Sequence, residues 1–307
     1  VEGYLCSLYR ILGENFVERL RGSFAFILFD KKKQKVIAAK DHASMKPLYY
    51  YGWSGNLIVA TNQSAIYTQK NFSRSINETR VSEYLNGILQ KSDHNFFNQI
   101  LSVPRSSYIV FENGKIKVKK YFSFDIDNPI ILKSDKEYAD CTREFFFRTL
   151  SNHVKIFNKF ASKISGGLDS TSICCALSKI SGNSNFPCIN IDYEGLDPEL
   201  LAYSNEEKYV DSATSLSSLN TFKKKIRIGD FPVISFLREM YATSDIPIPS
   251  FNHGFQIATF QELKKLGYDA VFDGFDGDSA ISFGKERLLK LRREHDFINF
   301  FYEKSKY

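Results

Sequence analysis

Several features that would assign a protein to a class at once are scarce or missing in this chain. Among its 307 residues there are two methionines, one tryptophan and five cysteines, and valine stands first. No apolar run is long enough to cross a bilayer. The first residues, VEGYLCSLYRILGENF, lack the basic start, apolar middle and small-residue end of a secretion signal. We therefore expect neither a transmembrane helix nor a membrane partner.

The cysteines and histidines form no recognisable metal or disulfide pattern. The number of cysteines is odd, no two of them have C-x-x-C spacing, and the five histidines show no spacing typical of metal ligands. This argues against structural zinc and against a disulfide framework. A reduced, cytoplasmic compartment fits these residues best.

Positive charge is in slight excess. The net charge is +6, and lysines cluster at residues 31–35, 115–120 and 223–225. The first two clusters fall where we expect hairpins to turn, so we interpret them as solvated turns. Binding to nucleic acid would need such clusters on one face with aromatic residues between them. We expect no nucleic-acid partner.

The remaining composition is that of a soluble globular protein, with 43% apolar and 25% charged residues and length enough for two domains. From about Phe24 to Phe124 the apolar residues alternate over short stretches that turn signals separate. Asn113-Gly114 between two such stretches is a strong hairpin signal. This half predicts an antiparallel sheet with a few helices, one of them over residues 78–89.

The pattern of apolar residues changes after a polar connector at residues 124–135. A helix is predicted over 136–155, and strand and helix candidates then alternate to the end. The predicted strands are 160–164, 188–193, 221–228 and 269–274, and the predicted helices begin near Ser170, Asn205, 232 and 253. Alternation of this kind predicts a parallel, doubly wound sheet. The overall fold class is therefore α/β with an α+β N-terminal part.

The stretch ISGGLDSTS at residues 164–172 joins the first of these strands to its helix. Glycines there let the backbone approach an anion, and the helix N-terminus offers unpaired N–H groups and a positive dipole. Asp169 would repel a phosphate unless a cation lies between them, which favours Mg²⁺. The alternative is a tight turn with Asp169 or Ser170 as an ordinary helix cap.

Several ordered motifs favour the first interpretation. SGGLDS resembles the loop of ATP pyrophosphatases, which cleave ATP between the α- and β-phosphates. The stretches LRGSFAFILFD and AAKDHASMKPLYYY resemble the class II glutamine amidotransferase domain of the asparagine synthetase family. SNEEKYVDSA, SDIPIPS and DGFDGDS resemble that family's synthetase motifs. The resemblance covers nearly the whole chain.

The resemblance implies two domains. Residues 1–125 would be a glutamine amidotransferase-like domain of the Ntn-hydrolase type, and residues 136–307 an asparagine synthetase-type ATP-binding domain of the adenine nucleotide α-hydrolase type. It also implies ATP and Mg²⁺ as cofactors and a small carboxylate or peptide as substrate. The chain could pair with a second copy of itself as a homodimer.

The resemblance also assigns roles to single residues. Asp169 and Asp278 would share Mg²⁺ and serve as the catalytic residues. Ile189 and Ile191 would flank the adenine, although an apolar strand residue is more commonly just core. Gly274 would shape the loop that presents Asp278. The residues expected to hold the pyrophosphate end of ATP are Ser165, Gly166, Gly167, Asp169 and Ser170.

Four departures limit this assignment. The family's glutaminase uses an N-terminal cysteine, whereas Val1 stands here and Cys6 is expected in the core, so we expect no glutamine hydrolysis by the chain as written. Ser279 replaces a glutamate typical of asparagine synthetases, which favours the β-lactam synthetase and lasso-peptide cyclase branch. Lys163 stands where the family is generally apolar. The chain also resembles a fragment truncated at both ends.

Three functions remain open. The chain could belong to an asparagine synthetase that takes ammonia from glutamine, to a cyclase that forms an internal amide, or to a non-catalytic nucleotide-binding remnant. A tRNA-modifying ATP pyrophosphatase is disfavoured, because such enzymes have no need of the amidotransferase-like half.

Overall fold

The chain folds into two compact units in a computed structural model. The structure describes residues 1–70, 72–88, 93–125, 127–183, 185–194, 206–217, 219–227, 238–242, 247, 252–277 and 285–304. The first unit comprises Val1–Ile131 and Ile234–Phe251, and the second comprises Leu132–Val233 and Asn252–Tyr307. No helix within the described ranges is long and apolar enough to cross a membrane.

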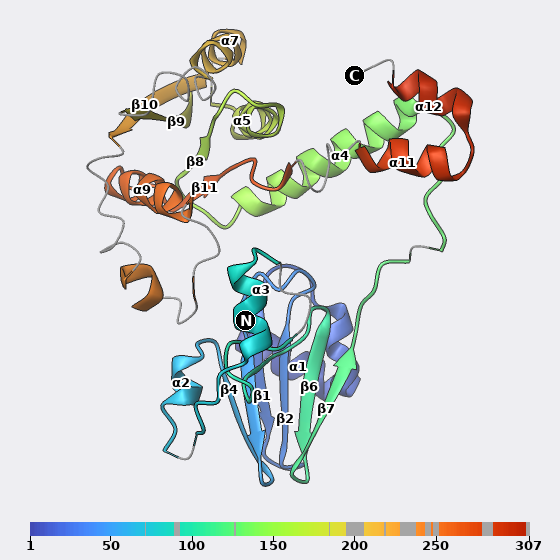
Figure 1. Cartoon of the computed structure of the whole chain (residues 1–307), viewed down its shortest axis with the longest axis vertical. Helices are drawn as coiled ribbons and strands as arrows, with labels where there is room; N and C mark the ends of the chain where they lie inside the picture. Colours follow the sequence, from blue (N-terminus) through green and yellow to red (C-terminus); the bar gives the residue numbers. More distant parts are fainter. Residues whose placement is uncertain are drawn as a thin grey trace. The chain divides into compact units, whose positions relative to one another are not determined.

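The first unit contains two antiparallel sheets, as its alternating sequence predicts (Figure 1). The larger has the order β1-β2-β6-β7 and the smaller the order β4-β3-β5. The strands are β1 (Ala25–Asp30), β2 (Lys35–Lys40), β3 (Tyr49–Trp53), β4 (Asn56–Ala60), β5 (Leu101–Ser102), β6 (Ser107–Glu112) and β7 (Lys115–Lys120). Asn113 and Gly114 have φ of 51° and 72°, the left-handed pair that a two-residue hairpin turn requires.

Strand β2 is the centre of this unit because both of its faces are buried. Ile37 and Ala39 pack with Phe16 and Val17, while Ala38 packs on the other face with Leu48. Phe16 and Val17 belong to a 3-10 segment, Gly13–Arg19, that follows helix α1 (Glu2–Leu12). Two further helices are α2 (Ser64–Tyr67) and α3 (Glu78–Leu85), the latter capped by Asn77.

Two expectations for this unit are wrong. Cys6 is exposed rather than in the core, because α1 packs through Leu5, Leu8 and Tyr9 and Cys6 lies off that stripe. The lysines at 115–120 do not form a turn. They lie on β7, which forms the edge of its sheet beside β6 among the described strands, and all four of these lysines are exposed.

The second unit contains four parallel strands in the order β10-β9-β8-β11. The strands are β8 (Phe160–Lys163), β9 (Phe186–Glu194), β10 (Leu219–Arg227) and β11 (Ala270–Phe272). The helices are α4 (Asp135–Val154), α5 (Leu168–Ser181), α7 (Glu207–Ser217), α9 (Asn252–Lys265), α11 (Lys285–Arg293) and α12 (Phe297–Lys304). The predicted alternation of strands and helices is confirmed over the described residues.

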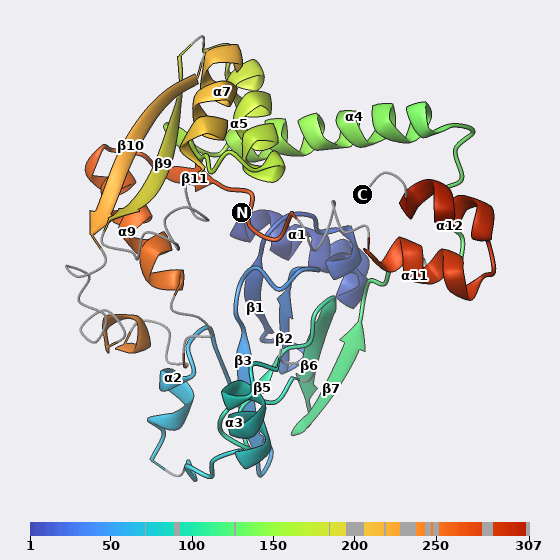
Figure 2. The same ribbon diagram turned by 45° about the horizontal axis from the view of Figure 1, so that its top comes forward.

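Helices cover both faces of this sheet (Figure 2). One core contains Ile164 and Cys188 from the strands with Cys174 and Leu177 from α5, and Val210 of α7 joins it. The other core places Leu263 of α9 against Ala161 and Ile189. Because residues next to one another on a strand point to opposite faces, the strands β8 and β9 contribute side chains to both cores.

The strand order fixes where a ligand can bind. The chain proceeds from β8 outward to β9 and β10, and β11 then lies on the opposite side of β8. The loops that follow β8 and β11 therefore diverge from one carboxyl edge of the sheet. Such a reversal of strand order is the point at which open parallel sheets bind ligands.

A partly exposed ion-pair cluster in the first unit yields a prediction about stability. Glu14 lies between Lys35 at 2.7 Å and Lys119 at 2.5 Å. Burial raises the pKa of Glu14, but hydrogen bonds from Lys119 and Lys35 outweigh it and hold the pKa below its ordinary value. The carboxylate therefore contributes stability above the pKa of the unfolded chain, and this stability is lost as the pH falls through the folded value.

We expect Glu14→Gln to lower the free energy of unfolding by about 1 kcal/mol at pH 7. The difference from wild type should shrink in acid, below about pH 4, where the glutamate of the unfolded chain is also protonated. Urea unfolding at several pH values measures it. Glu18→Gln, an exposed neighbour, is the control and should differ little from wild type at any pH. A difference for Glu14→Gln that is independent of pH would contradict the prediction.

Candidate functional site

The candidate site begins at the turn from β8 into α5. Helix α5 starts at Leu168, with Gly167 as its N-cap residue in an extended conformation. Gly167 provides no capping side chain, and no side-chain cap bond forms at this helix end. Asp169 is half-buried in the first turn of the helix rather than capping it. The interpretation of Asp169 or Ser170 as an ordinary cap is therefore wrong.

Two hydroxyl groups hold the loop in shape. The Oγ atoms of Ser165 and Ser170 lie 2.9 Å apart, and the backbone N–H of Ser165 donates to Ser170 Oγ over 3.1 Å. Ser170 Oγ also reaches the carbonyl oxygen of Gly167 at 3.3 Å. These bonds close the loop on itself and leave it preformed, so a ligand would not have to order it.

Gly166 allows the loop to lie against the start of α7. Its φ is +82°, and a Cβ atom there would collide with Tyr209 and lie in tight contact with the backbone of Val210 and Glu206. The left-handed conformation and the close approach both require glycine. The first glycine of the motif is therefore needed for packing between the loop and α7.

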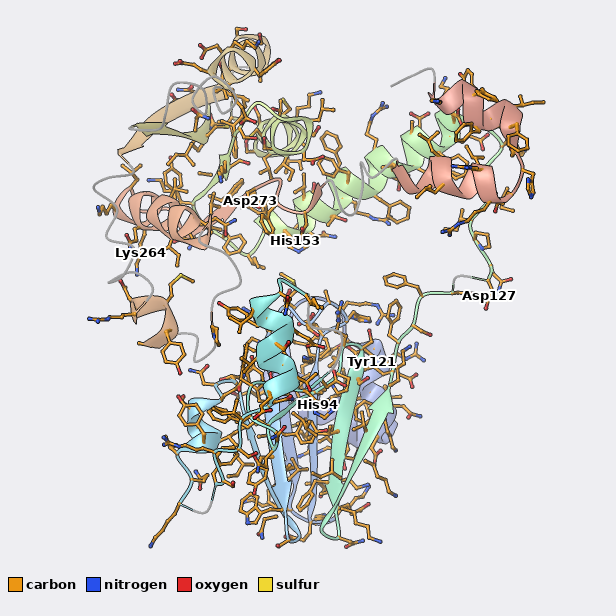
Figure 3. The ribbon with its side chains drawn as sticks, in the orientation of Figure 1. His94, Tyr121, Asp127, His153, Lys264 and Asp273 are labelled. Carbon is orange, nitrogen blue, oxygen red and sulfur yellow. The ribbon has the colours of Figure 1, made fainter. Side chains whose placement is uncertain are left out.

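The loop after β11 passes directly over Asp169. Asp273, which Figure 3 labels after β11, accepts a hydrogen bond from the backbone N–H of Phe275 at 3.1 Å. A Cβ atom on Gly274 would collide with the backbone of Ser170 and Asp169, and one on Gly277 would coincide with the Asp169 carboxyl group. Two segments about a hundred residues apart in the sequence thus meet at one carboxylate.

A cavity of about 400 Å³ opens where these segments meet. Lys163, at the end of β8, lies in its wall together with carboxylates from three elements. The lining residues are Lys163, Ser165, Gly167, Leu168, Asp169, Ser170, Glu206, Gln256, Asp273, Gly274 and Phe275. Burial raises the pKa of Glu206, and the positive charge of Lys163 partly offsets this rise, so these two side chains interact electrostatically.

A second, more apolar hollow of about 670 Å³ adjoins the first. Helix α4 and the loop after β11 each supply five of its lining residues, among them Tyr138 and Phe146 of α4, and α5 adds Asp169, Ser172 and Ile173. Asp169 and the Asp273–Phe275 segment line both hollows. A molecule in one hollow would therefore lie next to a molecule in the other.

Most of the predicted site residues that lie within the described part of the chain meet at this cavity. Ser165, Gly167, Asp169, Ser170 and Gly274 line the cavity, and Gly166 supports it from behind. Ile189 does not line it, since the side chain is 2% exposed and packs in the core beneath α9. Asp278 and the side chain of Ile191 lie outside the described residues.

Sequence reasoning missed three contributors to this site. Asn190 is buried on β9 and donates from Nδ2 to the carbonyl of Ile164 at 2.9 Å, which ties down the strand end before the loop. A polar residue inside the apolar stretch CINIDY was the available signal. Asp273 and Gln256 also line the cavity. No sequence pattern marks Gln256 as a site residue, because its position in the cavity wall depends on how α9 packs.

The first unit has a separate polar centre at Asp41. Its side chain is 2% exposed and accepts hydrogen bonds from four backbone N–H groups. The donors are those of Phe24, Ala43, Met45 and Lys46, at 3.0–3.3 Å. This carboxylate explains the conformation of the stretch KDHASMKPL without assigning it a catalytic role.

Comparisons with known proteins show what parts of this chain are similar to. The family described as "Glutamine amidotransferase domain" matches residues 3–122. A putative glutamine-hydrolyzing asparagine synthetase 2 from Methanocaldococcus jannaschii is 23% identical over 194 residues, 62% of this chain and 38% of the relative. Amidase chry2 from Gibberella zeae is 23% identical over 290 residues, 89% of this chain and 41% of the relative.

Two further matches complete these comparisons. Asparagine synthetase B from Escherichia coli is 26% identical over 176 residues, 57% of this chain and 26% of the relative. A solved glutamine-dependent NAD+ synthetase from Acinetobacter baumannii, in complex with adenosine diphosphate, aligns at 12% identity with a TM-score of 0.33. That alignment covers 88% of this chain and 63% of that chain, and its score is too low to inform the fold.

Residues 3–122 are therefore a glutamine amidotransferase domain. The domain is of the kind found in the asparagine synthetase family, and three relatives named as asparagine synthetases are similar to between 55% and 62% of this chain. The chain spans about two fifths of the length of the first curated relatives it matches, with shares of 38% and 41%.

The geometry around Gly166 predicts the effect of adding one methyl group. Gly166→Ala should lower the free energy of unfolding by about 3 kcal/mol, because it combines left-handed strain with a collision against α7. Gly182 is a matched control, since its φ is +62° and no atom lies within 4 Å of the added Cβ. Gly182→Ala should cost about 1 kcal/mol, from strain alone.

Urea unfolding of the two variants beside wild type measures this difference. Equal losses of stability in Gly166→Ala and Gly182→Ala would show that the loop after β8 does not pack against α7 as described.

Proposed function

We propose that the second unit binds ATP and Mg²⁺, and that the protein is an ATP-dependent carbon–nitrogen ligase of the asparagine synthetase type. The observation that carries the proposal is the meeting of two loops at the reversal of strand order. The loop after β8 supplies Asp169, and Gly277 of the loop after β11 lies against its carboxyl group. Asp278 is the next residue, although its position lies outside the described part of the chain.

The walls of the cavity suit the phosphates of a nucleotide. The start of α5 offers backbone N–H groups and the positive end of a helix dipole, and the glycines permit close approach. The hydroxyls of Ser165 and Ser170 add polar groups to this wall. The proposal includes an adenine nucleotide α-hydrolase-like fold for this unit and an Ntn-hydrolase-like fold for the amidotransferase domain.

The donor atoms also suit Mg²⁺. Among the described residues no group of three His, Cys, Asp or Glu side chains is placed to hold a metal. Mg²⁺ does not need such a cage, because it is commonly bound by one or two carboxylates together with substrate phosphates. Asp169 would be one ligand and Asp278 the second. Bound there, the ion would neutralise charge on the departing pyrophosphate.

The proposed reaction has two steps. An oxygen of the substrate carboxylate bonds to the α-phosphorus, and the bond from that phosphorus to pyrophosphate breaks. An amine then attacks the acyl carbon, AMP leaves with the electron pair of the acyl–oxygen bond, and the amine loses a proton. The chain's part in the first step is to position the phosphates, with Asp169 and the start of α5 as the binding groups.

The substrate remains open between two classes. In an asparagine synthetase the acid is aspartate and the amine is ammonia from glutamine, and the relatives named as asparagine synthetases favour this version. Ser279 in place of a glutamate favours an internal amine on a small carboxylate or peptide. The apolar hollow beside the cavity could accommodate the non-reacting part of either carboxylate substrate. Neither proposed reaction requires a homodimer, and both are compatible with one.

We expect Asp169→Asn to weaken the binding of ATP in the presence of Mg²⁺ by about tenfold or more, because the bridge between carboxylate and phosphates is lost. In EDTA the same substitution should leave the weaker ATP affinity unchanged or tighten it, because it removes a repelling charge. Isothermal titration with ATP under both conditions measures this. Exchange of labelled pyrophosphate into ATP, with candidate acids added, then tests the ligase.

The matched control is Glu144→Gln, which removes one carboxylate charge from the exposed surface of α4 away from the cavity. It should bind ATP like wild type under both conditions. Failure of the wild type to bind ATP with Mg²⁺ would refute the nucleotide site. Equal loss by Asp169→Asn with and without Mg²⁺ would refute the role of the metal.

A further inference from the structure

We propose that Lys163 binds the phosphate chain of the nucleotide directly, and that Glu206 is its counter-charge in the empty cavity. The inference rests on the proposed function and deepens it. It identifies a cationic phosphate contact on the protein itself, in addition to the metal.

Lys163 lies at a position where burial of an unpaired lysine side chain would cost free energy. It ends β8, which has strand neighbours on both sides, and its sequence neighbours Ser162 and Ile164 are each 0% exposed. Its backbone pairs with Ile189 of β9. Central strands of parallel sheets are usually apolar, because burial of an ammonium group costs free energy. Lys163 instead lines the cavity, as do Ser165 and Glu206.

The balance of charge in the cavity explains what the lysine does there. Three carboxylates line the described wall, those of Asp169, Glu206 and Asp273, and Lys163 is the one cationic side chain among those lining residues. A polyanion such as ATP would be repelled by this wall unless positive charge is supplied at the phosphates. A divalent ion at Asp169 would supply part of it, and the ammonium group of Lys163 would supply another part from the end of β8.

Glu206 explains how the lysine is kept in place. The residue precedes α7, and its backbone oxygen lies in the packing contact around Gly166. Its carboxyl group interacts with Lys163 electrostatically. Attraction between the two orients the ammonium group toward the cavity before a ligand arrives. A bound phosphate then competes with Glu206 for the same ammonium group, so the two residues should affect ATP affinity in opposite directions.

The test measures the binding of three probes, ATP, inorganic pyrophosphate and adenosine, by isothermal titration with the full chain. Lys163→Met should weaken ATP and pyrophosphate about tenfold and leave adenosine unchanged, with or without Mg²⁺. Lys163→Arg should recover most of the affinity. Glu206→Gln should tighten ATP binding about threefold, because the competing charge is gone. Lys179→Met, at an exposed position of α5, is the charge-matched control.

The outcomes separate this inference from the proposed function. If the wild type binds ATP and Lys163→Met binds it equally well, the inference is wrong and the proposed function stands. Equal weakening of adenosine would place the role of Lys163 in folding or base binding and would also overturn it. If the wild type binds pyrophosphate in a Lys163-dependent way but no ATP, the anion contact stands and the proposed function fails. Thermal melting of each variant shows whether the chain remains folded.

Discussion

The second unit depends on the contact between the Asp169 carboxyl group and the glycine-rich loop after β11. Gly274 and Gly277 have no side chains, and only for that reason can the backbone of this loop approach the first turn of α5. The approach closes the carboxyl edge of the sheet over β8 and forms the wall between two hollows. The proposed nucleotide and substrate sites both border that wall. A side chain at either glycine would move Asp169 or the loop, and the cavity would change with it.

The charge distribution in the cavity follows from the same contact. The loops place Asp169 and Asp273 in one wall, and Glu206 adds a third carboxylate from the start of α7. Such a wall does not attract an anion by itself. Under the proposed function it would become a phosphate site once the N-terminus of α5, a divalent ion and Lys163 supply positive charge. Nucleotide binding by so acidic a cavity would then depend on cations.

The amidotransferase domain shows a different use of a buried carboxylate. Asp41 accepts four backbone hydrogen bonds and is satisfied entirely by its own loop. Asp169 lines a cavity, and no backbone N–H group of the described residues is seen to donate to its carboxyl group. One aspartate therefore stabilises a turn, whereas the other borders a cavity. The difference lies in the donors around each carboxylate and not in the residue type.

Local patterns in the sequence determined a large part of this structure. The Asn113-Gly114 turn needs two left-handed residues, and the apolar stretches around Ile37 and Ile189 bury both faces of a strand, so turns and strands follow from neighbours in the chain. The SGGLDS motif likewise predicted a loop that joins a strand to a helix, and the structure confirms this junction between β8 and α5. Only the tertiary structure determined which helices and strands pack against one another. Cys6 is exposed because α1 rotates a different stripe inward, Ile189 is core because α9 covers it, and Asn190 and Gln256 reach the site from distant segments. These outcomes depend on contacts between residues far apart in the sequence, and no local periodicity encodes them.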